Sequence, residues 1–102
     1  MGIRDIKTAN EVLAEELEDP EFRREWERTA LARAVANQVI AYRAEHDLTQ
    51  SELAKLLGMH QPQVARIEAG DHTPEILTLV RLSRTLGLEF HIDITPRALT
   101  VA

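Results

Sequence analysis

The feature that most constrains this sequence is a pair of very short helical segments separated by a single glycine. Residues 49–52, Thr-Gln-Ser-Glu, predict a sharp helix start, because the threonine side chain can cap the open N–H groups while the glutamate reaches back to the threonine backbone. Gly58 can take the left-handed conformation that ends this helix. A second helix begins almost at once, with Pro62 acceptable in its first turn and Gly70 as its end. The pattern predicts two short helices joined by a tight turn.

Two further helical patterns precede this pair. Apolar residues spaced by three and four predict a short helix over residues 9–17, with Thr8 as its cap. Asp19 followed by Pro20 is a second start signal, because aspartate can accept from the first-turn N–H groups and proline is tolerated there. No glycine or proline interrupts the apolar pattern that follows, so we expect one long helix from this point to about His46.

On the C-terminal side the apolar residues change their period. A strongly apolar helix should begin at Thr73 or Pro74 and pack centrally. From Phe90 to Thr95 apolar and polar residues alternate, which predicts a strand. A second alternation over residues 99–101 could fold back on this strand around Pro96-Arg97, but two strands alone are only marginally stable in water. The same strand of a second copy is therefore the simplest additional partner.

The residues of the two short helices resemble the Cro and C1 repressor type of helix-turn-helix, also called the Xre family. The resemblance is carried by LTQSELAKLLG at residues 48–58 and QPQVARIEAG at residues 61–70, and it covers roughly residues 35–87 when the flanking helices are included. The resemblance implies that the second short helix is a recognition helix, which lies in the major groove of DNA.

The family pattern also implies a role for individual residues. Gln50 would hold a phosphate and brace the recognition helix. Gln61 and Gln63 would read bases, since a glutamine amide can pair with N6 and N7 of adenine, although both could instead be ordinary solvated side chains. Arg66 would meet a guanine edge or a phosphate. The residues expected at DNA are Thr49, Gln50, Gln61, Gln63, Arg66, His72 and Thr73, the last two as contacts to the DNA backbone.

Patterns and resemblance together predict a mainly α fold, a five-helix helix-turn-helix bundle with an N-terminal helical extension and a short C-terminal strand. The resemblance assigns Arg43 and Glu68 to a structural ion pair beneath the recognition helix. We expect three segments: residues 1–28 as the helical extension, residues 29–88 as the DNA-binding domain, and residues 89–102 as the strand segment that contacts a second copy.

The charge is distributed unevenly along these segments. Residues 1–28 hold nine acidic and five basic side chains, whereas residues 29–88 hold six of each, and the whole chain has a net charge of -5. The acidic end would repel DNA, and a neutral middle binds DNA only if its bases gather on one face. Attraction to phosphates should be weak in one copy, so we expect a homodimer on double-stranded operator DNA.

The whole chain resembles a narrower group, the Hig-type antitoxins of toxin-antitoxin pairs. This resemblance is carried by Asp-Pro-Glu-Phe at residues 19–22, the single motif, the length and the strand near the C-terminus. It implies a RelE/Hig-type toxin that cleaves messenger RNA, and repression of the antitoxin's own operon. An acidic extension would suit a basic toxin, because complementary charge speeds encounter. The residues that could bind a toxin are Val12, Leu13, Leu17, Phe22 and Trp26, although we favour a core position for at least one of the two aromatic residues.

The leading hypothesis is therefore a cytoplasmic antitoxin that binds DNA. A plain dimeric repressor without a toxin and a protein-binding module that has lost DNA affinity remain open. An enzyme is not expected, because no nucleophile stands in a recognisable setting, and neither is a cofactor. No pair of histidines has the close spacing of a zinc site, so no metal is expected. The absence of cysteine favours a reducing compartment, and neither a signal peptide nor an apolar stretch of about 20 residues occurs.

Overall fold

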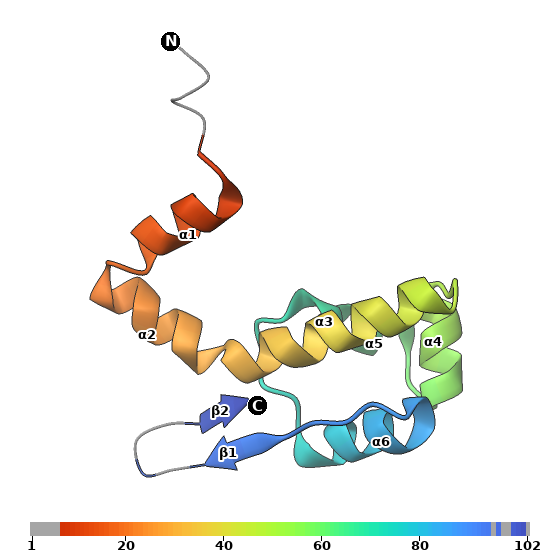
Figure 1. Cartoon of the computed structure of the whole chain (residues 1–102). Helices are drawn as coiled ribbons and strands as arrows, with labels where there is room; N and C mark the ends of the chain where they lie inside the picture. The colour runs from red at the N-terminus through yellow and green to blue at the C-terminus, as the bar shows by residue number, and fades with distance from the viewer. Residues whose placement is uncertain (1–6, 95, 97–98, 102) are drawn as a thin grey trace.

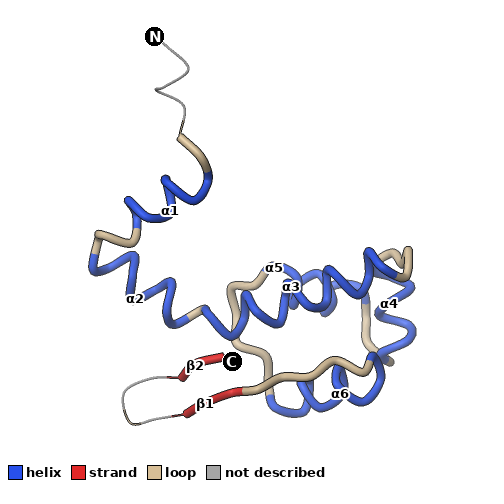
Figure 2. Tube along the Cα trace, viewed as in Figure 1, coloured by secondary structure: helices blue, strands red, loops and turns tan. Residues whose placement is uncertain are grey.

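A computed structural model describes residues 7–94, 96 and 99–101 of the chain. Within these residues the chain forms six helices followed by a two-stranded antiparallel sheet (Figures 1 and 2). The prediction of a mainly α helix-turn-helix fold with a short C-terminal strand is confirmed. The elements are α1 (Ala9–Glu16), α2 (Pro20–Arg28), α3 (Ala30–Glu45), α4 (Gln50–Leu57), α5 (Gln61–Ala69), α6 (Ile76–Leu86), β1 (Ile92–Ile94) and β2 (Leu99–Val101).

A single hydrophobic core holds α3, α4, α5 and α6 together. Its most deeply buried side chains are Val35 and Val39 of α3, Leu53 of α4, Val64 of α5 and Leu82 of α6, each of them 0 % exposed. Burying a side chain of this size stabilises a fold by about 1.5–3 kcal/mol. The two short helices are therefore held by their neighbours, since helices of eight or nine residues are marginal when isolated.

The start and end signals of the first short helix act as the sequence predicted. Thr49 Oγ1 accepts a hydrogen bond from the backbone N–H of Glu52 at 3.1 Å, and Glu52 Oε1 accepts from the Thr49 N–H at 3.0 Å. The bond from the Thr49 backbone N–H, with a smaller effect from the Thr49 side chain, lowers the pKa of Glu52. Gly58 ends the helix in the left-handed conformation, with φ +67°.

The prediction of one long helix from Pro20 to about His46 is wrong, and the described residues form six helices where five were expected. The helix breaks at Thr29, whose backbone departs from helical geometry at φ -97° and ψ 8°. Thr29 Oγ1 donates to the carbonyl oxygens of Glu25 and Trp26, and Arg33 in turn donates to Thr29 Oγ1. A threonine that bonds back to the preceding turn bends a helix, which is the physical reason for the break.

Helices α1 and α2 form an arm, residues 9–28, that projects from the body (Figure 1). Neither helix carries a buried residue. The expectation of a core position for Phe22 or Trp26 is therefore wrong, because both rings are only half-buried on α2 and stack on each other with centroids 6.2 Å apart. The guanidinium carbon of Arg33 lies 3.4 Å from the centre of the Trp26 ring, so a cation–π contact joins the arm to α3.

The C-terminal hairpin is shorter than the sequence predicted. Strand β1 begins at Ile92 rather than at Phe90, and it pairs with β2 so that Ile92 lies opposite Val101. Strand β2 lies beside α3. The chain thus supplies a partner strand for β1 from its own C-terminus. Thr95 and Arg97, the predicted strand end and part of the predicted turn, lie outside the described residues.

Helix α6 also differs from its prediction, both in the residue at which it begins and in how much of it is buried. It begins at Ile76 and not at Thr73 or Pro74, because Glu75 is still extended, with ψ 152°. Leu79 and Leu82 pack in the core, but Ile76 is 71 % exposed. The helix therefore packs centrally along one side only. No helix in the described part of the chain is long and apolar enough to span a bilayer.

Gly70→Ala should destabilise the protein more than Gly58→Ala. Both glycines have a φ close to +68°, where a side chain costs about 1–2 kcal/mol. A Cβ at position 70 would also lie 3.3 Å from the Ala36 Cβ, whereas nothing lies within 4 Å of one at position 58. Urea denaturation of the two variants would measure the difference, and equal losses of unfolding free energy would show that the close approach of α5 to α3 carries no cost.

Candidate nucleic-acid interface

Helix α5 presents a polar side outward from the body because its apolar residues are spaced for burial. Val64 is fully buried and Ile67 is half-buried, three residues apart on one side of the helix. Gln61, Gln63 and Arg66 are all exposed. The turn at Gly58 places this helix against α4, as a helix-turn-helix requires.

A chain of polar contacts runs from α3 to the first residue of α5. Arg43 donates through Nε to Glu68 Oε2 at 2.8 Å and through Nη2 to Glu68 Oε1 at 2.9 Å. Gln50 Nε2 donates to the same Glu68 Oε1 at 3.1 Å, and Gln61 Nε2 donates to Gln50 Oε1 at 2.8 Å. The structure thus brings four of the predicted residues into one hydrogen-bonded series, which we call the polar chain: Arg43, Glu68, Gln50 and Gln61.

Burial and hydrogen bonding act on the Glu68 carboxylate in opposite directions. Its side chain is only 7 % exposed, and burial alone would raise the pKa of the carboxyl group. Hydrogen bonds from Arg43 and Gln50, with the charge of Arg43, outweigh that effect, so the pKa of Glu68 lies below its ordinary value. Glu68 therefore stays ionised and holds both donors at neutral pH.

The polar chain fixes Gln61 and leaves it hydrogen-bonding capacity. A glutamine amide has two N–H donors and an oxygen with two lone pairs, and the bond to Gln50 uses one donor. Gln63 is held differently, because its Oε1 accepts from the backbone N–H of His60 at 2.8 Å. Both amides are therefore oriented at the start of α5 while remaining able to bond an external partner.

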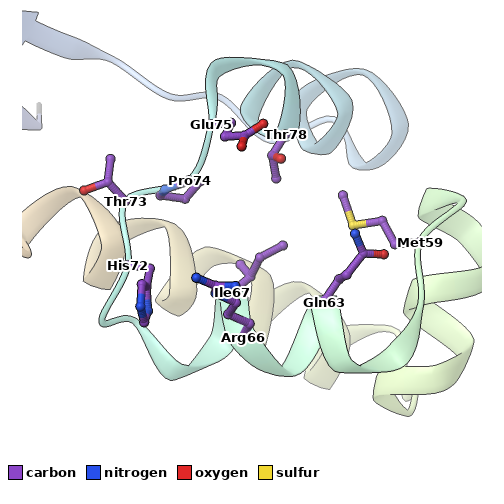
Figure 3. A pocket seen from close by; sticks show the side chains of 9 residues that line it. All are labelled: Met59, Gln63, Arg66, Ile67, His72, Thr73, Pro74, Glu75 and Thr78. Carbon is purple, nitrogen blue, oxygen red and sulfur yellow. The ribbon is translucent and has the colours of Figure 1, made fainter.

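Two hollows of about 290 Å³ each flank α5. Figure 3 shows the first, the α5–α6 groove, with the side chains of Gln63 and Arg66 on one side and those of Glu75 and Thr78 on the other. The second lies between α4 and the start of α5. The α5–α6 groove collects four of the residues predicted at DNA, namely Gln63, Arg66, His72 and Thr73. The second hollow contains Gln61 together with Ser51, Lys55 and His60.

An acidic residue, Asp71, lies beside the basic side chains of the α5–α6 groove. His72 Nδ1 lies 2.5 Å from Asp71 Oδ1, and this hydrogen bond, with a smaller effect from the charge of Arg66, lowers the pKa of Asp71. The Nδ1 atom of His72 is thus occupied, and its Nε2 is the ring nitrogen left for another hydrogen-bonding partner. The local charge is mixed, so attraction to a phosphate at this edge is moderate.

Comparison with known proteins agrees with this geometry. A helix-turn-helix family profile matches residues 39–92. The chain belongs to the Xre-type helix-turn-helix family. Antitoxin HigA1 of Mycobacterium tuberculosis is 37 % identical over 74 residues, which is 72 % of this chain and 50 % of that protein. An uncharacterised HTH-type transcriptional regulator of Haemophilus influenzae is 37 % identical over 54 residues, 53 % of this chain and 55 % of the regulator.

The chain spans about half the length of these two relatives. No solved structure shows significant similarity to it. The match to the family profile confirms the resemblance seen in LTQSELAKLLG and the residues that follow it. The family consists of DNA-binding regulators and not of enzymes.

The remaining predicted residues lie away from the polar chain or have a local role. Thr49 is exposed and its hydroxyl caps α4. In the arm, Val12 is 45 % exposed, and Leu13, Leu17, Phe22 and Trp26 are half-buried. Within the described residues no three histidine, aspartate or glutamate side chains gather as a metal site.

Only Gln61 of the second hollow was among the predicted site residues, and three side chains there that could donate to a phosphate, Ser51, Lys55 and His60, were not. The sequence carried a signal for two of them: Leu53 and Leu57 point α4 into the core, so residues offset from that apolar side must face outward. Ser51 and Lys55 meet that condition, and both line the hollow. His60, at the cap position of α5, is the third.

Glu68→Gln should lower the unfolding free energy at neutral pH by about 1–3 kcal/mol, because an amide nitrogen would then face the donors of Arg43 or Gln50. The native pKa of Glu68 is lowered, so its contribution is present above the unfolded-state pKa and is lost as the pH falls through the native pKa. The difference between the wild type and the variant should therefore shrink in acid.

Denaturant titrations at neutral and acidic pH would measure that difference. The exposed Glu27→Gln of α2 is the matched control and should change stability little at either pH. A gap between wild type and Glu68→Gln that is independent of pH would contradict a stabilising carboxylate at this position.

Proposed function

We propose that this chain is a DNA-binding antitoxin. Two copies would read an inverted-repeat operator with α5 and repress the chain's own operon, while the arm of α1 and α2 neutralises a basic toxin of the RelE/Hig type that cleaves messenger RNA. The family assignment supports the DNA-binding half, and the similarity to antitoxin HigA1 supports the toxin half. Because the target is operator DNA, the proposed place of action is the cytoplasm.

The observation that carries the DNA-binding half is the orientation of two exposed amides at the start of α5. Gln61 is tied through Gln50 to the buried Glu68, and Gln63 is tied to the backbone of His60. An amide held in place loses little conformational entropy when it pairs with N6 and N7 of adenine. Arg66, one turn along α5, would reach a guanine edge or a phosphate.

The two hollows beside α5 provide room for the DNA backbone. A helix that lies in the major groove has one phosphate strand on each side. His72 and Thr73 line one hollow, and Ser51 and Lys55 line the other. Side chains of these types commonly bind phosphate and fix the register of a protein on a duplex without reading its sequence.

The features of the arm favour a role in binding a partner protein over a role in extending the hydrophobic core. Its helices bury none of their residues, and it keeps a stacked aromatic pair and Val12 partly accessible. Aromatic residues often dominate the binding energy of protein interfaces. The acidic balance of residues 1–28 favours a basic partner. A plain repressor would have no use for such an arm unless the arm joined two copies.

Gln61→Ala and Gln63→Ala should each weaken binding to the preferred duplex by about 5-fold to 150-fold while changing binding to a scrambled duplex little. The preferred duplex would be selected by the wild-type protein from a random pool, and gel shifts at fixed salt would give both affinities. Asn37→Ala, which removes an exposed amide from α3, is the matched control. If the double variant keeps its preference between the two duplexes, the glutamines do not read bases.

Removing residues 1–28 should abolish toxin neutralisation and leave the affinity for the preferred duplex intact. The candidate toxin to test is any small basic protein that an adjacent reading frame encodes, co-expressed with each variant while growth is measured. Leu13→Asp and Trp26→Asp in the full chain test the same surface without a truncation, and Ala14→Asp on the same arm controls for added charge. If the truncated chain still neutralises the toxin fully, the toxin binds a surface other than the arm. If the candidate toxin does not arrest growth when it is expressed without any antitoxin, the toxin half of the proposal is wrong.

A further inference from the structure

His72 stands in the α5–α6 groove with only one of its two ring nitrogens available to DNA. Its Nδ1 lies 2.5 Å from Asp71 Oδ1, and its side chain is 57 % exposed. Figure 3 shows the ring at one end of the groove. A DNA phosphate that approaches this end would therefore meet the Nε2 atom of the ring.

The hydrogen bond to Asp71 determines what Nε2 can do. The bond from His72 lowers the pKa of Asp71, so this carboxyl group is ionised at neutral pH. An ionised carboxylate only accepts hydrogen bonds, so Nδ1 must carry the proton that joins the pair. A neutral imidazole has a single N–H, which leaves Nε2 with a bare lone pair. Phosphate oxygens are acceptors as well, so Nε2 can bond a phosphate only after the ring takes up a second proton.

The other charges at the groove add to the effect of that proton. Arg66 of α5 lies in the groove with Glu75 from the start of α6, and Asp71 lies beside them in the loop. While His72 is neutral, one positive charge stands against two negative charges, and this balance disfavours a phosphate. Protonation of His72 makes the charges equal in number and supplies a charge-assisted donor.

We propose that His72 binds a DNA phosphate as an imidazolium ion, so that operator binding is coupled to the uptake of a proton. The inference rests on the proposed function, because it needs a DNA strand in the α5–α6 groove, and it adds a pH-dependent regulation of that site. Histidine is the side chain that ordinarily changes its charge between about pH 5 and pH 8. Because the protonated form binds more tightly, the complex is favoured as the pH falls. The amides of Gln61 and Gln63 do not titrate, so base reading is unaffected.

Two other histidines serve as comparisons. His91 Nε2 lies 3.6 Å from Glu89 Oε2, so this histidine also stands beside a carboxylate, but it lines neither of the two hollows. His91→Gln is therefore the matched control. His60 lines the second hollow and would also lie near DNA, which makes it the alternative source of a pH dependence.

The affinity for the preferred duplex, measured by fluorescence anisotropy at fixed ionic strength, tests the coupling. The wild type should bind about 10-fold or more weakly at about pH 8 than at about pH 6, because each copy loses one charge-assisted hydrogen bond. His72→Gln should bind with nearly equal affinity at the two pH values, and His91→Gln should keep the wild-type ratio. Calorimetry in buffers of different ionisation enthalpy should detect proton uptake on binding by the wild type and none by His72→Gln.

Asp71→Ala tests the part played by the hydrogen bond. Without the carboxylate, a neutral His72 can carry its proton on Nε2 and donate it to a phosphate, so the ratio of the affinities at the two pH values should fall well below that of the wild type. If the only effect of Asp71 were its negative charge, the variant would bind more tightly at both pH values and keep the wild-type ratio. An unchanged ratio would therefore contradict the inference.

Three further results would overturn the inference and leave operator binding in place. They are equal affinity of the wild type at the two pH values, a pH dependence that His72→Gln keeps, and a pH dependence that His60→Gln removes and His72→Gln does not. A wild-type chain that selects no duplex at either pH would instead overturn the proposed function on which the inference rests. The two failures are therefore distinguishable.

Discussion

The carboxylate of Glu68 is the group on which both the body of the protein and the candidate nucleic-acid interface depend. It lies on α5, receives two hydrogen bonds from Arg43 of α3 and receives one from Gln50 of α4. Three helices thus converge on one almost completely buried ion. An ion in such a place destabilises a fold unless it is fully paired, so the geometry of its partners is tightly defined. Glu68 therefore fixes the position of the Gln50 side chain, and Gln50 in turn orients Gln61 through a single hydrogen bond.

The polar chain explains how a protein with so small a hydrophobic core can hold surface side chains in a fixed orientation. The hydrophobic core fixes the axes of α3 to α6, but apolar contacts are not directional and leave a surface amide free to rotate. Hydrogen bonds supply the missing direction. Glutamine has several rotatable bonds, so an amide that is already bonded to a second side chain starts from far fewer conformations than a solvated one. The orientation of the exposed Gln61 amide therefore depends on hydrogen bonds that begin in the interior of the protein.

Local signals in the sequence determined what could be predicted, and tertiary contacts determined what could not. Thr49, Glu52 and Gly58 act within one or two turns, so the bounds of α4 followed from the residues alone. The break at Thr29 did not, because threonine is tolerated in helices and the sequence does not show that its hydroxyl bonds back to the carbonyl oxygens of Glu25 and Trp26. The uncovered side of α6 was equally invisible, since periodicity shows that a helix has apolar residues but not how many of its sides another element will cover.

The candidate site divides along the same line. The resemblance placed Gln50, Gln61, Arg43 and Glu68 at matching positions, but it could not show that the four side chains form one continuous series or that His72 bonds Asp71. That second contact bears on how the site can work. With Asp71 and Glu75 beside Arg66, the groove cannot rely on a strong field of positive charge, and the chain as a whole is acidic. Binding that draws little on phosphate attraction must draw more on shape and on base edges. In the proposed function, a neutral amide whose direction is fixed from the interior would meet that requirement, because the pairing of an amide with a base edge depends on geometry rather than on charge.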